Sequence, residues 1–166
     1  MELKTTHKAW WNTSAVLLVG AGLLASGCAS LNVRQAVTNG DLVSTRQHLE
    51  TKGESPESPN DCGWTLLHLA SYYQYPPLVE YLIQRKANVN APTAKHSDQC
   101  MAYSKIPAGS TPLIIAAYYG QADIIDILVR SGADRNLKNA EGYTALMYAR
   151  KFEFSLSAHA LEAAGQ

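Results

Sequence analysis

Residues 109–120 read GSTPLIIAAYYG, and this stretch decides the fold because its pattern returns twice along the chain. The same Gly-x-Thr-x-Leu pattern starts again at Gly142, 33 residues downstream, as GYTALMYAR. It also occurs upstream from Gly63, as GWTLLHLA. Self-similarity at such a period is typical of arrays in which each supersecondary unit buries its apolar face against the next unit. The sequence therefore predicts a repeat protein.

Two copies of the pattern are followed by a second apolar segment, whose apolar residues recur at intervals of one, three and four positions. This spacing places them on one face of a helix. The later of these helices is expected to end at Gly132, since glycine readily takes the left-handed C-cap conformation. A threonine is placed to cap each first helix, and Pro112 suits the first helical position. The apolar stripes are Leu78, Val79, Leu82 and Ile83, then Ile124, Ile125, Leu128 and Val129, and the threonines are Thr65, Thr111 and Thr144.

These motifs resemble the ankyrin repeat, whose signature combines a Gly, a Thr-Pro-Leu-His-like opening, paired alanines and a Gly-Ala-Asp-like ending. The resemblance implies an all-α solenoid of helix-turn-helix units joined by β-turn loops, with about four repeats in the domain at 32–166. The first and last units match less well, as expected where one face of a repeat meets water instead of a neighbour. The predicted units lie at 32–60, 61–91, 107–139 and 140–165, with an insert at 92–106.

The N-terminal segment differs in kind from the rest of the chain. Basic residues precede an apolar stretch at 15–25, which is the pattern of a secretory signal peptide at 1–27. The segment ends in Leu-Ala-Ser-Gly-Cys and resembles the lipobox of bacterial lipoproteins, with Cys28 as the lipidated residue and 28–31 as the lipidated N-terminus and linker. Ala29, in place of the aspartate that retains lipoproteins in the inner membrane, implies the periplasmic face of the outer membrane. The alternatives are an ordinary cleaved signal with a chance cysteine, or an uncleaved anchor.

Two further cysteines, Cys62 and Cys100, are expected to form a disulfide in an oxidising compartment. Cys62 precedes the second unit and Cys100 lies in the insert before the third, so stacking the units would bring their turns close. Closing this loop would stabilise the fold by roughly 4 kcal/mol. The alternatives are two free thiols, or a metal site on His96 and Cys100. The metal site lacks a second pair of residues at ligand spacing.

Composition and motifs argue against other function classes. Fourteen basic and fourteen acidic residues give a formal net charge of zero, with no basic run, so nucleic acid is not expected as a partner. No Gly-rich phosphate loop, nucleophile elbow, paired-carboxylate arrangement or zinc-helix motif occurs. His68 occupies the His of the family signature, where the resemblance implies structural hydrogen bonds. We expect no enzymatic activity, no small-molecule substrate, no cofactor and no bound metal.

The resemblance also indicates where a protein partner would bind. In ankyrin repeats, the variable residues beside the turn Gly and after the paired small residues line the concave face. Here these positions are rich in aromatic residues, which offer large contact area with little rotamer entropy to lose. Aliphatic residues already supply a core between the units, so we expect the aromatics to face the partner; the alternative is that Tyr73 and Tyr119 pack locally. The predicted binding residues are Trp64, Tyr72, Tyr73, Tyr118, Tyr119, Tyr143 and Phe152.

A lipid-anchored binding domain of this kind suggests two roles, both with a protein partner and with membrane contact only through the lipid. The first is an immunity protein that neutralises an antibacterial toxin, such as a phospholipase delivered by a type VI secretion system. The alternative is an envelope adaptor or stress-response protein that supports a periplasmic enzyme such as a catalase. The sequence does not separate the two, because a fold indicates binding but not the client.

Overall fold

The computed structural model describes residues 32–94 and 105–163, which form helices and connecting loops without a strand. The helices come in four pairs, one for each predicted unit, so the predicted all-α repeat architecture is confirmed. In chain order the helices are α1 (Val33–Thr38), α2 (Leu42–Thr51), α3 (Leu66–Tyr72), α4 (Pro76–Gln84), α5 (Pro112–Tyr118), α6 (Ala122–Arg130), α7 (Ala145–Lys151) and α8 (Ser155–Ala163).

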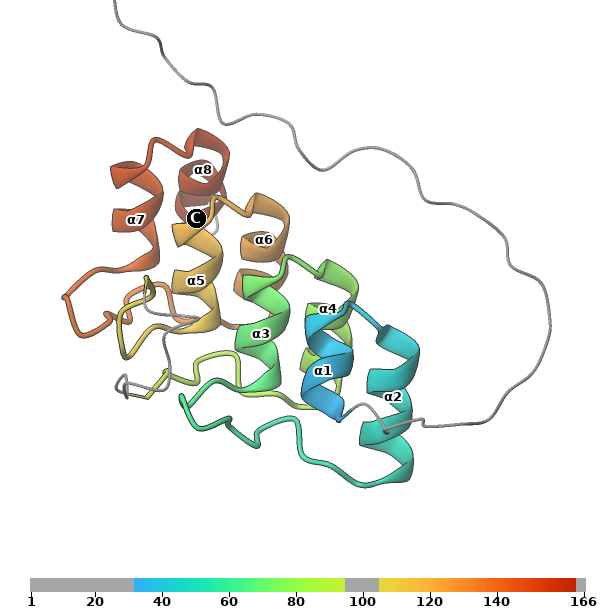
Figure 1. Ribbon diagram of the computed structural model, residues 1–166. Coiled ribbons are helices and arrows are strands. Elements are labelled where there is room, and N and C mark those ends of the chain that lie inside the picture. The colour runs from blue at the N-terminus through green and yellow to red at the C-terminus, as the bar shows by residue number, and fades with distance from the viewer. Residues whose placement is uncertain (1–31, 95–104, 164–166) are drawn as a thin grey trace, which may run out of the picture.

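The helices stack in two layers, so that each unit is a pair of helices joined by a short turn (Figure 1). One layer contains α1, α3, α5 and α7, in which each helix contacts the next, and the other contains α2, α4, α6 and α8. The short turns lie together at one end of the stack, and the longer loops between units lie at the other end (Figure 1). We call the first end the turn edge; it comprises residues 39–41, 73–75, 119–121 and 152–154.

The apolar core lies between the two layers and between successive units. Leu67 and Ile115 of the first helices are inaccessible to solvent, as are Val79 and Ile125 of the second helices. Complete burial of an aliphatic side chain of this size contributes about 1.5–3 kcal/mol. The stack is therefore held together mainly by apolar contacts between neighbouring units.

The predicted helix ends are confirmed. Thr111 precedes α5, and its hydroxyl oxygen accepts a hydrogen bond from the backbone N–H of Ile114 at 3.3 Å. Pro112 is the first residue of α5, where its fixed φ fits and its missing N–H is not needed. Gly132 follows α6 with φ +88°, in the left-handed region. The other two predicted N-cap residues, Thr65 and Thr144, precede α3 and α7.

His68 is fully buried and joins the start of α3 to the next unit. Its Nδ1 accepts a hydrogen bond from the backbone N–H of Thr65 at 3.1 Å. Its Nε2 then carries the proton and donates to the carbonyl oxygen of Ser110 at 3.2 Å. Burial lowers the pKa of His68 to about 4, so the ring is neutral at pH 7. These contacts confirm the structural role predicted for this histidine.

The insert between the second and third units is closed at its base. The backbone N–H of Thr93 donates to the carbonyl oxygen of Ser110 at 3.0 Å, and the N–H of Gly109 donates to that of Thr93 at 2.9 Å. The two ends of the insert are thereby held together, and the third unit stacks on the second despite the extra residues. The middle of the insert, with His96 and Cys100, lies outside the described residues.

Within the two described ranges, no helix combines the length and the hydropathy that crossing a membrane requires. The predicted signal peptide, the lipobox cysteine Cys28 and Ala29 lie outside these ranges. The lipid anchor and the location at the outer membrane therefore stay predictions.

Candidate protein-binding surface

Aromatic side chains form a continuous series of ring contacts across the last three units. Tyr72 of α3 packs edge-on against Tyr119, which follows α5, with ring centroids 5.3 Å apart. Tyr118 of α5 packs against Tyr148 of α7 at 5.2 Å. Edge-to-face pairs of this kind stabilise by about 0.5–1.5 kcal/mol beyond the area that they bury. Contacts within units join Trp64 to Tyr72, Tyr72 to Tyr73 and Tyr118 to Tyr119, and a further contact between units joins Tyr118 to Phe152.

Trp64 belongs to the core and cannot contact a partner. Only 1% of its surface is exposed, and its ring centroid lies 5.9 Å from that of His68 and 5.4 Å from that of Tyr72. The prediction that Trp64 takes part in partner binding is therefore wrong. The reason is that its large ring packs back onto the start and the end of α3, where the neighbouring side chains cover it.

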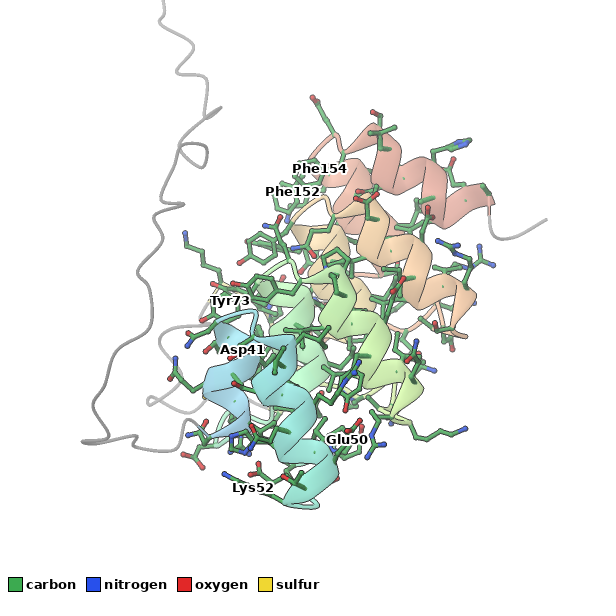
Figure 2. The ribbon with its side chains drawn as sticks, turned by 90° about the vertical axis from the view of Figure 1, so that its right-hand side faces the viewer. Asp41, Glu50, Lys52, Tyr73, Phe152 and Phe154 are labelled. Carbon is green, nitrogen blue, oxygen red and sulfur yellow. The ribbon has the colours of Figure 1, made fainter. Side chains whose placement is uncertain are left out.

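The six remaining predicted residues keep part of their side chains accessible, and we call them the aromatic surface. Tyr73 and Phe152 are the most exposed of the six, each with 38% of its surface accessible. Both belong to the turn edge, and Figure 2 shows them along the same side of the molecule as Phe154. The members of the aromatic surface are Tyr72, Tyr73, Tyr118, Tyr119, Tyr143 and Phe152.

The expectation that aromatic residues are not needed between the units is wrong for Tyr119. Its ring contacts Tyr72 of the preceding unit, and burial, together with the nearby Tyr72 hydroxyl, raises the pKa of Tyr119 far above its ordinary value. Tyr119 therefore packs against a neighbouring helix, as in the local-packing alternative, but that helix belongs to the preceding unit. Tyr73 differs, because its ring contacts only rings of its own unit, Tyr72 and Tyr75, within the described residues and stays on the surface.

The C-terminal end of the aromatic surface carries a cation. Lys151 Nζ lies 4.6 Å from the centroid of the Tyr143 ring and 5.8 Å from that of Phe152, within the range of cation–π attraction. Beneath them, the buried Tyr148 hydroxyl donates to Glu141 Oε2 at 3.2 Å. Burial raises the pKa of Tyr148 to about 12, so its hydroxyl stays protonated at neutral pH. This end can therefore receive an acidic or polar group of a partner.

Sequence reasoning missed Tyr75 and Phe154, which support the turn edge from below. The ring of Tyr75 lies against Gly40, and the ring of Phe154 lies against Gly120, in each case in the turn of the preceding unit. A side chain at either glycine would collide with the ring that covers it. A glycine followed by an aromatic residue about one repeat later is the signal that could have revealed these pairs.

Cys62 forms a disulfide, which argues against the free-thiol alternative. Its predicted partner Cys100 lies outside the described residues, so the pairing itself stays a prediction, as does the alternative metal site on His96 and Cys100. In the parts of the chain that the structure describes, no group of three or more His, Cys, Asp or Glu residues is arranged to hold a metal ion.

Comparison with known proteins agrees with this architecture. The family described as "Ankyrin repeats (3 copies)" matches residues 33–139 and, in a second match, residues 94–155. The ankyrin repeat and SAM domain-containing protein 6 of Rattus norvegicus is 34% identical over 86 residues, which are 52% of this chain and 8% of that protein. The E3 ubiquitin-protein ligase Ufd4 of Drosophila melanogaster is 31% identical over 111 residues, which are 67% of this chain and 4% of that protein.

The chain thus spans less than a tenth of the length of these relatives. The family match, in contrast, extends over most of the residues that form the stacked helix pairs. On the strength of that match and of the four stacked units, the chain belongs to the ankyrin-repeat family.

Proposed function

We propose that this chain is a lipid-anchored protein at the periplasmic face of the outer membrane, and that it binds one protein partner through the aromatic surface. Ankyrin repeats are protein-interaction modules, and their stacked units create extended binding surfaces. Within that class, the role that we propose is immunity: the domain binds an incoming antibacterial toxin of the phospholipase type and blocks its active site. The lipid on Cys28 would hold the domain where such a toxin arrives.

The exposure of Tyr73 and Phe152 is the observation that carries the proposal of protein binding. Aromatic side chains are enriched among the residues that dominate interface energies. Both rings are already held by neighbours, since Tyr73 packs against Tyr75 and Phe152 against Phe154. A partner would therefore bind rigid rings, and little side-chain entropy would be lost on association.

The disulfide at Cys62 supports a location outside the cytoplasm. Disulfides persist in oxidising compartments such as the bacterial periplasm and are rare in the cytosol. A secretory signal at 1–27 and a periplasmic lipid anchor at Cys28 agree with that chemistry. Cys28→Ser should release the protein from membrane fractions if Cys28 is the lipidated residue.

Partner capture followed by affinity measurement tests the proposal. The purified full-length chain is used to capture proteins from periplasmic and secreted extracts, and the dissociation constant of the recovered partner is measured by calorimetry. We expect the double variant Tyr73→Ala, Phe152→Ala to weaken binding by at least about tenfold, or ~1.4 kcal/mol. The control Val43→Ala removes an exposed apolar side chain on α2 and should leave binding unchanged. Unchanged affinity of the double variant, with its helices intact, would refute the aromatic surface as the binding site.

The identity of the partner then separates the roles. Recovery of a secreted toxin, together with killing of a deletion strain by its siblings, supports immunity. Recovery of a periplasmic enzyme such as a catalase, with killing unaffected by the deletion, overturns immunity and supports the adaptor role.

A further inference from the structure

A groove runs along the layer of second helices, between α6 and α8, and opens at the turn edge. It consists of two adjoining hollows, of about 590 Å³ and about 380 Å³, which share Ala122, Asp123 and Leu156. The larger hollow continues between the two helices to Val129 and Ala160. The layer that contains this groove faces the viewer in Figure 2. It is separate from the exposed rings of Tyr73 and Phe152, which do not line it.

Apolar and small side chains dominate the larger hollow. Leu156 is 75% exposed and lines both hollows, so its side chain is accessible to a partner. Leu156, Ala160 and Ala163 recur along one face of α8, and all three line the groove. Small residues on such a face let another helix approach closely, so the groove has the shape that a helix ridge requires.

The hollow nearer the turn edge exists because the third unit departs from its neighbours. Tyr75 and Phe154 cover the turns of the units before them, but the corresponding residue of the third unit is Gln121. Gln121 lies beside Gln74, and both line the smaller hollow. The carboxamide nitrogen and oxygen of Gln121 are buried without a hydrogen-bond partner within the described part of the chain. Both atoms are covered by neighbouring groups, so Gln121 shapes this hollow and does not itself present a hydrogen-bonding group to a partner.

The groove also has an electrostatic preference. Asp123 and Asp126 lie on its α6 wall, both are exposed, and neither takes part in an ion pair among the described residues. Arg130 lies further along α6, where its Nε donates to the carbonyl oxygen of Asp126 at 3.2 Å. The end of the groove at the turn edge is therefore acidic beside an apolar floor, which complements a cation flanked by apolar side chains.

We propose that this groove is a second docking surface, which binds a short amphipathic helix of a protein partner. The apolar face of that helix packs against Leu156 and Ala160, and a lysine or arginine one turn away pairs with Asp123 and Asp126. This is the helix-in-groove mode of recognition, in which apolar anchors at helical spacing provide affinity and charges provide orientation. The proposal concerns the same class of partner as the proposed function. Its contact residues differ from Tyr73 and Phe152, and Tyr119 is the one member of the aromatic surface that also lines the groove.

Two fluorescent amphipathic peptides test the proposal, one built of leucine and lysine and the other of leucine and glutamate. Each is titrated with the full-length chain in nanodiscs of neutral phospholipid, with empty nanodiscs as the blank, and binding is followed by fluorescence anisotropy. We expect the lysine peptide to bind and the glutamate peptide to bind at least about tenfold more weakly, because of the acidic wall. Leu156→Gln, which removes the apolar contact without a change of charge, and the double variant Asp123→Lys, Asp126→Lys should each weaken binding of the lysine peptide.

Val43→Gln is the matched control, because Val43 is 78% exposed at the equivalent position of α2 and lies outside the groove. It should leave peptide binding unchanged. The proposal is overturned if both peptides bind alike, if neither binds, or if Val43→Gln acts as strongly as Leu156→Gln. The variant Tyr73→Ala, Phe152→Ala should keep peptide binding, so failure of the groove and failure of the aromatic surface can be told apart.

Discussion

The ring of Phe154 covers Gly120 so closely that a Cβ at Gly120 would lie 2.8 Å from Cδ1 of the ring. Gly120 also has φ +71°, a left-handed conformation that side chains disfavour. We therefore expect Gly120→Ala to lower the free energy of unfolding by about 2–4 kcal/mol, which combines the backbone cost with the steric cost. Urea unfolding followed by circular dichroism measures the change.

Gly132→Ala is the control for this prediction. Gly132 has φ +88°, but a Cβ there would meet no atom within 4 Å. The substitution should carry the backbone cost alone, about 1–2 kcal/mol. Equal losses for the two variants would show that the Phe154 ring moves aside at no cost and does not tie the third and fourth units together.

Lys86 offers a stabilising substitution. It follows α4 with φ +68°, at the position that Gly53 and Gly132 occupy after α2 and α6. Because glycine adopts this conformation without strain, Lys86→Gly should raise the free energy of unfolding by about 0.5–1 kcal/mol. The thermal midpoint would rise accordingly. Lys52→Gly, at φ −94°, should have the opposite effect, and stabilisation by both variants would contradict the explanation.

Local patterns predicted most of the fold because each pattern acts within one unit. A threonine, a following helical stripe and Gly132 define one helix pair without reference to the rest of the chain. The base of the insert could not be predicted in this way. The hydrogen bond between Thr93 and Ser110 joins backbone groups across the insert, and no pattern of side chains predicts it.

The candidate site was harder to predict because exposure depends on what neighbouring side chains cover. Trp64 and Tyr73 both occupy positions that the family resemblance assigns to the binding face, yet 1% of one and 38% of the other is exposed. The ring of Tyr72 contacts both, so the difference depends on the other groups that cover each ring, and the position in the repeat does not reveal these. The covering of Gly120 by Phe154 likewise joins two units, so a motif read within one unit could not reveal it.

Burial of His68 predicts a dependence of stability on pH. Its pKa is lowered from 6.5 to about 4 in the folded protein, so between these values the unfolded chain binds more protons. The contribution of His68 is complete above pH 6.5 and declines as the pH falls toward 4, by about 3 kcal/mol in total. Urea unfolding across this range measures the slope. In His68→Gln, the loss of stability between pH 6.5 and pH 4 should be smaller by that amount. An unchanged loss would assign the pH dependence to other groups.

Substitutions at Trp64 and Tyr73 should affect stability and partner binding differently. Trp64→Ala removes a ring that is buried against His68 and Tyr72, so it should lower the free energy of unfolding by about 3–5 kcal/mol. Tyr73→Ala truncates a ring at the surface and should cost less than about 1 kcal/mol of stability while it weakens partner binding. Trp64→Phe keeps an apolar ring in the core, and it should leave the partner's dissociation constant unchanged in calorimetry. If folded Trp64→Phe lost as much affinity as Tyr73→Ala, Trp64 would have to be counted among the binding residues.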